Sequence, residues 1–205
     1  MGLGTYCPFS LHWHMEDFGF YFQFGWDHII DIGALDHIFF ITALAAIYML
    51  KDWKQVLILV TAFTLGHAIT MILSSKNLIE VNTGWIEFLI PCTIVVTALS
   101  NLFQKTFTQR TIRINYFLAL FFGLIHGLAY ANLIKFMITG EQDFIWSWFS
   151  FSVGLEAGQI LVVFLILLLA QLFVGIFKLN RRIWVMTVSG AVLIFALKMA
   201  IERVP

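Results

Sequence analysis

Histidines and carboxylates interrupt stretches of this 205-residue sequence that are otherwise strongly apolar. An ionisable side chain inside a membrane-spanning helix costs about 3 kcal/mol or more unless it is paired or faces water, so each one needs a reason. Imidazole nitrogens and carboxylate oxygens are ligands of first-row divalent metals. The candidate ligands are His28, Asp36, His37, His67, His126 and Glu156, and the supporting polar residues are Asp31, Thr64, Glu87 and Gln159.

The local spacing of these residues favours shared helix faces. Side chains three or four positions apart lie on the same side of a helix. Glycines precede or flank three of the candidates, and small residues let helix backbones approach closely. The spaced pairs are His28 with Asp31, Thr64 with His67 and Glu156 with Gln159, and the glycines are Gly66, Gly123, Gly127, Gly154 and Gly158.

The composition indicates that a membrane must position these side chains. The chain is 60% hydrophobic and only 12% charged, and its mean hydropathy is +0.90. A soluble domain is about 25% charged. The net charge is zero and gives no indication of a nucleic-acid partner. We therefore expect the lipid bilayer to be the solvent of this chain.

A spanning helix needs about 20 apolar residues, and six segments qualify. We predict an all-α, polytopic membrane helix bundle of about six transmembrane helices. An aromatic segment at 18–32 precedes them and is predicted to form an interfacial or half-membrane helix. Residues 1–14 are expected to be a tail, or to lie upstream of a start at Met15, and 15–205 to form one transmembrane domain. The predicted spans are 34–50, 54–73, 83–103, 113–137, 144–177 and 182–201.

Lysine and arginine in the connections predict the orientation. With six spans, eight basic residues collect on one side and three on the other. Basic residues favour the cytoplasmic side. We therefore expect an inner-membrane protein with both termini on the non-cytoplasmic side. The eight are Lys51, Lys54, Lys105, Arg110, Arg113, Lys178, Arg181 and Arg182, and the three are Lys76, Lys135 and Arg203.

This orientation gathers the polar residues at one depth. At about 1.5 Å per residue, His67 and His126 each lie about 20 Å beyond the cytoplasmic start of their helix. Glu156 lies about 18 Å from the outer start of its own helix. Asp36 and His37 fall within a turn of an outer end. All of them are expected between the middle of the membrane and its outer face.

Structural roles are open for each residue taken singly. Asp36 could cap a helix, and His67 or His126 could form interhelical hydrogen bonds. Cys92 in an apolar run is typical of a buried thiol. The sequence has no HExxH motif, nucleophile elbow or phosphate loop. The hypothesis of a metal site therefore depends on the whole set.

Four segments resemble motifs of the HupE/UreJ membrane proteins and occur in the family's order. GWDHIIDIGALDHIFF (25–40) resembles its G-x-x-H-I-x-x-G-x-D-H motif, and AFTLGHAIT (62–70) resembles its F-T-x-x-H-S-x-T. FGLIHGLAYA (122–131) resembles F-G-L-I-H-G-x-G-F-A, and FSVGLEAGQ (151–159) resembles F-N-x-G-V-E-x-G-Q. The departures are Ala68 in place of Ser, Leu128, Ala129 and Tyr130 in place of the G-F pattern, and Ser152 in place of Asn.

The resemblance implies a small polytopic protein that handles nickel or cobalt. It carries over His28, Asp36, His37, His67, Glu87, His126 and Glu156 as metal-site residues. A membrane permease or delivery protein for nickel, cobalt or zinc is the leading hypothesis, and it leans away from an enzyme. An intramembrane zinc-dependent hydrolase and a non-catalytic subunit of a membrane complex stay open. The expected partners are the metal ion and the lipid bilayer, with further membrane-complex partners or a homo-oligomer.

Overall fold

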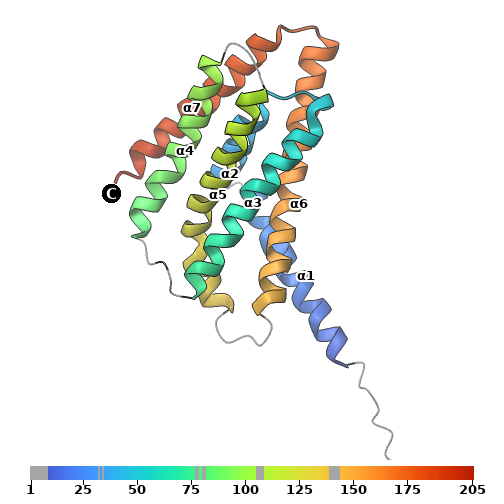
Figure 1. The fold of residues 1–205 in the computed structure, drawn as a ribbon, viewed down its shortest axis with the longest axis vertical. Coiled ribbons are helices and arrows are strands. Elements are labelled where there is room, and N and C mark those ends of the chain that lie inside the picture. Colours follow the sequence, from blue (N-terminus) through green and yellow to red (C-terminus); the bar gives the residue numbers. More distant parts are fainter. Residues whose placement is uncertain are drawn as a thin grey trace, which may run out of the picture.

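The protein is a bundle of helices (Figure 1). The computed structural model describes residues 9–31, 33, 35–76, 79, 82–104, 109–138 and 144–205. The helices it contains are α1 (Phe9–Ile30), α2 (Asp36–Ala45), η1 (Leu50–Asp52), α3 (Trp53–Ser75), α4 (Thr83–Phe103), α5 (Gln109–Ile138), α6 (Phe144–Ala170), the π-helical turn η2 (Gln171–Ile176) and α7 (Arg181–Glu202).

Successive long helices run in opposite directions, as short connections require. Helices α3, α5 and α7 begin at one end of the bundle, where α2, α4 and α6 finish (Figure 1). We call this the basic end, because seven of the eight basic residues counted above lie in or beside its described connections, and the eighth, Lys105, is outside the described residues. Helix α1 and helix α6 both start from the opposite end.

Four helices of the described chain are long and apolar enough to cross a membrane, so the predicted count of six is not confirmed. They correspond to the second, third, fifth and sixth predicted spans. The third prediction, 83–103, has the same bounds as α4. Helix α5 extends over 30 residues. The four are 50–75, 83–103, 145–176 and 181–202.

The first predicted span, 34–50, was wrong as a single helix. Helix α2 has only 10 residues and ends at Ala45. The chain then turns, because the Asp52 carboxylate accepts a hydrogen bond from the backbone N–H of Met49 at 3.1 Å and starts the next helix. At about 1.5 Å per residue, α2 covers about half a membrane.

Helix α1 precedes α2 and starts from the end of the bundle opposite the basic end. It has 22 residues and begins at Phe9, inside the expected tail, whereas residues 1–8 lie outside the described part of the chain. It ends beside Asp31, whose carboxylate accepts a hydrogen bond from the Gly33 N–H at 2.8 Å. Such a side-chain bond competes with the helical ladder. The break between α1 and α2 therefore lies within the bundle.

Helices α1 and α6 run parallel and touch through glycines. A Cβ on Gly25 would overlap the Phe151 carbonyl oxygen, and a Cβ on Gly154 would overlap the Phe22 carbonyl oxygen. Gly158 faces Ile29. Absence of a side chain at these positions lets two backbones approach closely. The contact fixes the level at which α1 ends, beside the middle of α6.

Helices α3 and α5 form a second parallel pair of the same kind. A Cβ on Gly123 would overlap the Phe63 carbonyl oxygen, and a Cβ on Gly66 would overlap the Leu120 carbonyl oxygen. Gly127 faces Thr70. This pair runs from the basic end, so it is inverted relative to the pair of α1 and α6 (Figure 1).

The two pairs correspond residue by residue. Positions 22, 25 and 28 of α1 match 120, 123 and 126 of α5 at one constant offset, and both helices carry F-G-x-x-H. Positions 63, 66 and 70 of α3 match 151, 154 and 158 of α6 in the same way, and both carry F-[ST]-x-G.

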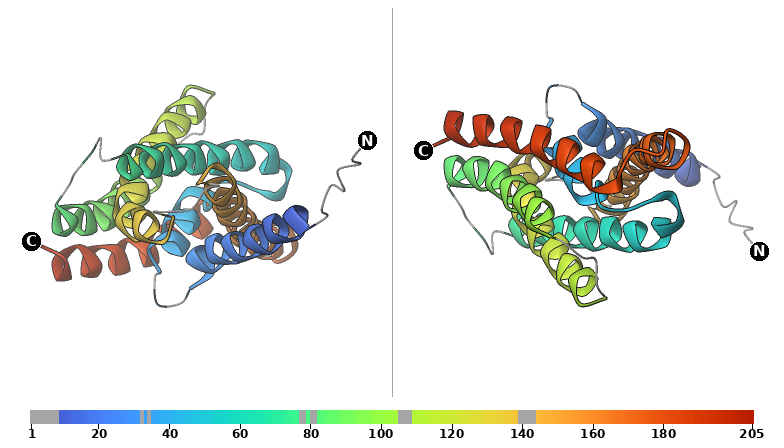
Figure 2. Two further views of the ribbon diagram at one scale, coloured as in Figure 1. Left: turned by 90° about the horizontal axis from the view of Figure 1, so that it is seen from below. Right: turned by 90° about the horizontal axis from the view of Figure 1, so that it is seen from above.

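Helices α4 and α7 are the third corresponding pair and pack side by side (Figure 2). Asn82 and Asn180 cap them identically, each accepting a hydrogen bond from the N–H two residues on. The buried Ala98 and Ala196 match at the offset that relates α1 to α5. The chain therefore consists of two inverted halves of similar helix arrangement, and α2 belongs to the first half.

The glycine contacts predict a selective loss of stability. In Gly25→Ala or Gly123→Ala, the new methyl group should force the paired helices apart and lower the free energy of unfolding by about 1–3 kcal/mol, as overpacking does. Thermal unfolding of the detergent-solubilised protein measures this loss. Gly19→Ala is the control, because nothing lies within 4 Å of its added Cβ. An equal midpoint for Gly25→Ala and Gly19→Ala would contradict the close contact.

Candidate metal site

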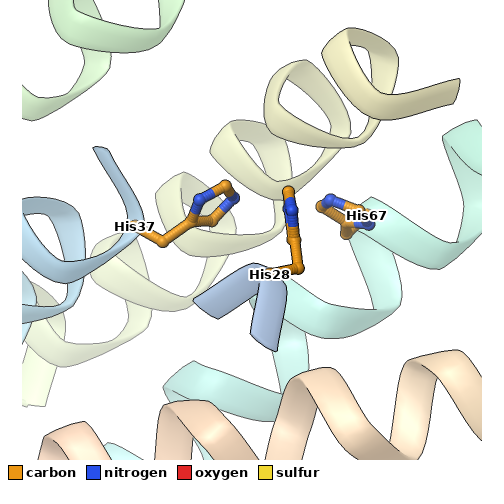
Figure 3. Close-up of side chains that lie close together, drawn as sticks. All are labelled: His28, His37 and His67. Atoms are coloured by element: carbon orange, nitrogen blue, oxygen red, sulfur yellow. The ribbon is translucent and has the colours of Figure 1, made fainter. Parts of the chain in front are cut away.

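Three histidines from three helices meet where α1 ends and α2 begins. His28 lies in the last turn of α1, His37 in the first turn of α2 and His67 in the middle of α3. One ring nitrogen from each lies within 4.8 Å of the other two. The three rings face one another (Figure 3). We call these residues the histidine triad.

Two of the three triad residues are almost completely buried. His37 is 6% exposed and His67 is 1% exposed. The ring centroids of His28 and His37 are 4.4 Å apart. Phe151 of α6 packs against His28 at 6.1 Å and against His67 at 6.3 Å. The site is therefore formed by imidazoles and aromatic rings, and a cation there would exchange water for nitrogen ligands.

The hydrogen bonds of His67 leave one nitrogen available to a metal. Its Nδ1 lies 3.2 Å from the sulfur of Met71. A thioether sulfur only accepts, so Nδ1 carries the proton. Its Nε2 is buried and has no hydrogen-bond partner in the described structure. This nitrogen therefore presents a lone pair to the triad.

His37 makes fewer side-chain hydrogen bonds than His67. Neither its Nδ1 nor its Nε2 has a hydrogen-bond partner in the described structure, although both are buried. A buried polar group without a partner costs about 1–3 kcal/mol. One of these nitrogens carries a lone pair that is available to a metal ion.

His126 of α5 lies next to the triad, on the far side of His37. Its ring centroid is 5.2 Å from that of His37. Its Nε2 is 3.1 Å from the Thr93 hydroxyl, which donates its only proton to the Ile90 carbonyl. The Thr93 oxygen must therefore accept from Nε2, and Nδ1 of His126 keeps its lone pair.

A cavity of about 460 Å³ leads from the surface to His28 and His37 of the triad and to His126. Glu87, near the start of α4, and Arg203, just after α7, place its mouth on the half of the bundle opposite the basic end. Asp27, Asp31 and Glu87 are exposed in it. Four of its lining residues are acidic and one is basic. They are Phe24, Asp27, His28, Asp31, Asp36, His37, Glu87, Ile90, His126, Ala129 and Arg203.

Asp36 lines this cavity but is already paired. Arg203 donates to its two carboxylate oxygens, at 2.8 Å and 3.3 Å. The Asp36 side chain is only 12% exposed, and a two-pronged guanidinium contact is the strong form of this ion pair. Asp36 therefore stands beside the triad with its charge balanced by α7.

The other predicted site residues lie apart from the triad. The Glu156 carboxylate accepts a hydrogen bond from Thr61 at 2.6 Å, and Gln159 accepts one from Thr64 at 2.9 Å. These bonds join α3 to α6, and neither Glu156 nor Gln159 lines the cavity. Their role as metal-site residues stays a prediction.

Four residues of the site were not singled out from the sequence. Arg203 entered only the count of basic residues, and nothing in its spacing relates it to Asp36. Met71 is four residues after His67 on the same face, a signal that could have found it. Thr93 resembles any helical threonine. Asp27 adjoins His28 and was visible as an acidic neighbour.

Comparison with known proteins agrees with this arrangement. A family model described as HupE / UreJ protein matches residues 9–203. No curated protein and no solved structure matches the chain. The match covers nearly the whole chain, including the triad, His126 and Arg203. The apolar helices and this match together identify a membrane protein, and the chain belongs to the HupE/UreJ family.

Proposed function

We propose that this protein binds a divalent nickel or cobalt cation at the histidine triad and carries it through, or delivers it across, the membrane. The observation that supports this most is the meeting of three buried imidazoles from three helices within 4.8 Å. Imidazole suits nickel, cobalt and zinc, and the family directs the choice to nickel or cobalt.

The charge distribution supports entry from the non-cytoplasmic side. We assign the basic end to the cytoplasm by the preference of Lys and Arg for that side. The cavity then opens outward. Asp27, Asp31 and Glu87 give its mouth a negative field, which raises the local concentration of cations.

The surroundings of the triad favour a binding or transport role over hydrolysis. A zinc hydrolase needs a general base beside the metal-bound water. Asp36 has both oxygens on Arg203, and Glu156 is held by Thr61. Neither carboxylate is free to act as that base beside the triad.

Substitution of His37 distinguishes a metal ligand from a histidine that only stabilises the fold. Because His37 makes no hydrogen bond through its ring nitrogens, His37→Phe should keep the metal-free protein as stable as wild type. It should lower nickel or cobalt affinity at least tenfold. Elemental analysis and the visible absorption of bound Co²⁺, measured on purified protein, test the affinity.

Cellular uptake of nickel should fall in the same His37→Phe variant, while thermal unfolding without metal stays unchanged. Ile38→Val, on the same turn, is the matched control and should leave both properties as in wild type. If His37→Phe unfolds much more easily and still binds the cation, its role is structural and the proposed metal site is wrong.

Substitution of Arg203 tests its ion pair with Asp36 beside the triad. In Arg203→Gln, a nearly buried Asp36 carboxylate loses its partner, so the metal-free protein should become less stable by about 3 kcal/mol. The same change removes a positive charge that repels the incoming cation. Nickel affinity should therefore rise about tenfold, and the metal should raise the unfolding midpoint more than in wild type.

Lys198→Gln is the control for this experiment, since Lys198 pairs with Glu202 on an exposed part of the same helix. It should change neither stability nor affinity. Unchanged nickel affinity in Arg203→Gln would show that Asp36 takes no part in cation binding.

A further inference from the structure

A stripe of polar side chains leads from the triad toward the basic end along α4. Thr93, Thr97 and Asn101 are spaced by four residues and therefore share one face. All three are buried in a helix that is otherwise largely apolar. Thr93 contacts His126 at 3.1 Å, so the stripe starts at the metal site and extends about 12 Å inward.

Two further cavities follow this stripe. The first has a volume of about 20 Å³, and the second has about 280 Å³. Asn101 lines both, so the two cavities adjoin at this side chain. The small cavity is lined by Leu44, Thr97, Ser100, Asn101, Asn115, Leu118 and Phe122, and the large one reaches Gln104, Asn180, Arg181 and Arg182 at the basic end.

The polar groups of the stripe present oxygen atoms. Thr93 donates its proton to the Ile90 carbonyl, and Thr97 donates its proton to the Thr93 carbonyl. Asn101 uses its amide nitrogen to donate to Ala43 and Ser189. The hydroxyl and carboxamide oxygens keep lone pairs for other contacts. Such oxygens suit a cation that has lost part of its water.

We propose that the stripe Thr93–Thr97–Asn101 is the inner half of the pathway for the divalent cation, between the histidine triad and the basic end. This proposal rests on the proposed function, because a pathway requires a transported cation. The cation would leave the triad along these three residues.

The inverted halves supply independent support. The correspondence that relates α1 to α5 and α4 to α7 maps Phe24 and Glu87 of the outer cavity onto Phe122 and Val185. Phe122 lines the small inner cavity, and Val185 lines the large one. The inner cavities therefore include the counterparts of these two residues, whereas His28 and Asp31 map onto His126 and Ala129, which line the outer cavity itself.

The pathway is closed in its middle, between the outer cavity and the large inner cavity. A volume of about 20 Å³ holds about one water molecule, too little for a hydrated cation. Leu44, Leu118 and Phe122 close around it. The outer cavity of about 460 Å³ is wide by comparison. Passage inward therefore requires α5 to move relative to α4 at this narrow point.

His37 provides the transfer step. Its ring lies 4.4 Å from His28 and 5.2 Å from His126, measured between centroids. A cation that moves from the triad toward His126 and Thr93 can therefore keep His37 as a ligand throughout.

The test uses nickel uptake into proteoliposomes that contain the full-length purified protein. Thr97→Val keeps the shape of the side chain and removes the hydroxyl, so uptake should fall at least tenfold while nickel binding to the triad stays as in wild type. Thr97→Ser restores the hydroxyl and should restore uptake. Thr187→Val, on an exposed face of α7, is the matched control and should transport normally.

A second measurement does not depend on transport rates. In a Cys7→Ser, Cys92→Ser background, Thr97→Cys should react with a membrane-impermeant thiol reagent applied from the basic end, and excess nickel should change that rate. Val96 is the neighbouring residue on the outer surface of α4, a candidate membrane span, where lipid would keep the reagent away. The thiol of Val96→Cys should therefore react slowly, and nickel should not change its rate.

The outcomes are distinguishable. Wild-type uptake in Thr97→Val, together with equal reactivity of Thr97→Cys and Val96→Cys, overturns the pathway and leaves the triad in place. Absence of nickel uptake by the wild-type protein overturns the proposed transport itself, and with it the pathway.

Discussion

The site depends on the direct contact of helix backbones at two glycine positions. Gly25 on α1 and Gly123 on α5 each touch a backbone carbonyl of the neighbouring helix. The histidine one turn later, His28 or His126, is thereby carried to the phenylalanine of the partner helix, Phe151 or Phe63. A larger residue at either glycine would move the ring away from the cluster. In lipid, where no hydrophobic driving force joins helices, such close van der Waals contact is what holds a bundle together.

The break between α1 and α2 follows from the same constraint. Non-helical backbone is tolerated at membrane depth only where protein or water covers it. Here Asp31 accepts a hydrogen bond from the Gly33 N–H, and Asp31 itself lines the cavity. The break lets two histidines from one passage, His28 and His37, face each other at 4.4 Å, which a continuous helix could not do with residues nine apart. The inverted partner α5 has no such break, and it supplies one histidine.

The sequence predicted the membrane class, the bounds of α4 and the residues of the triad, because long apolar runs and isolated histidines are local signals. It missed the end of α2 at Ala45, since no proline or glycine marks it, and the turn is fixed by Asp52. It also missed the inverted halves. The F-G-x-x-H segments at Phe24 and Phe122 are short, and the offset that relates α3 to α6 differs from the one shared by the other two helix pairs. Arg203 reaches Asp36 from the other end of the chain, a contact that only the three-dimensional packing reveals.

The chemical type of the ligands changes along the proposed pathway. A conducted ion must bind well enough to enter and weakly enough to leave. Acidic side chains stand at the outer mouth, imidazoles at the centre, and neutral hydroxyl and amide oxygens on the inner stripe. First-row transition metals hold nitrogen ligands more firmly than such neutral oxygens. A cation that passes His126 therefore meets weaker ligands than the imidazoles, and Arg182 donates to the Gln104 carbonyl at the inner mouth. The weaker ligands of the inner stripe let the cation leave, and the gradient of the cation across the membrane sets the direction of net transport.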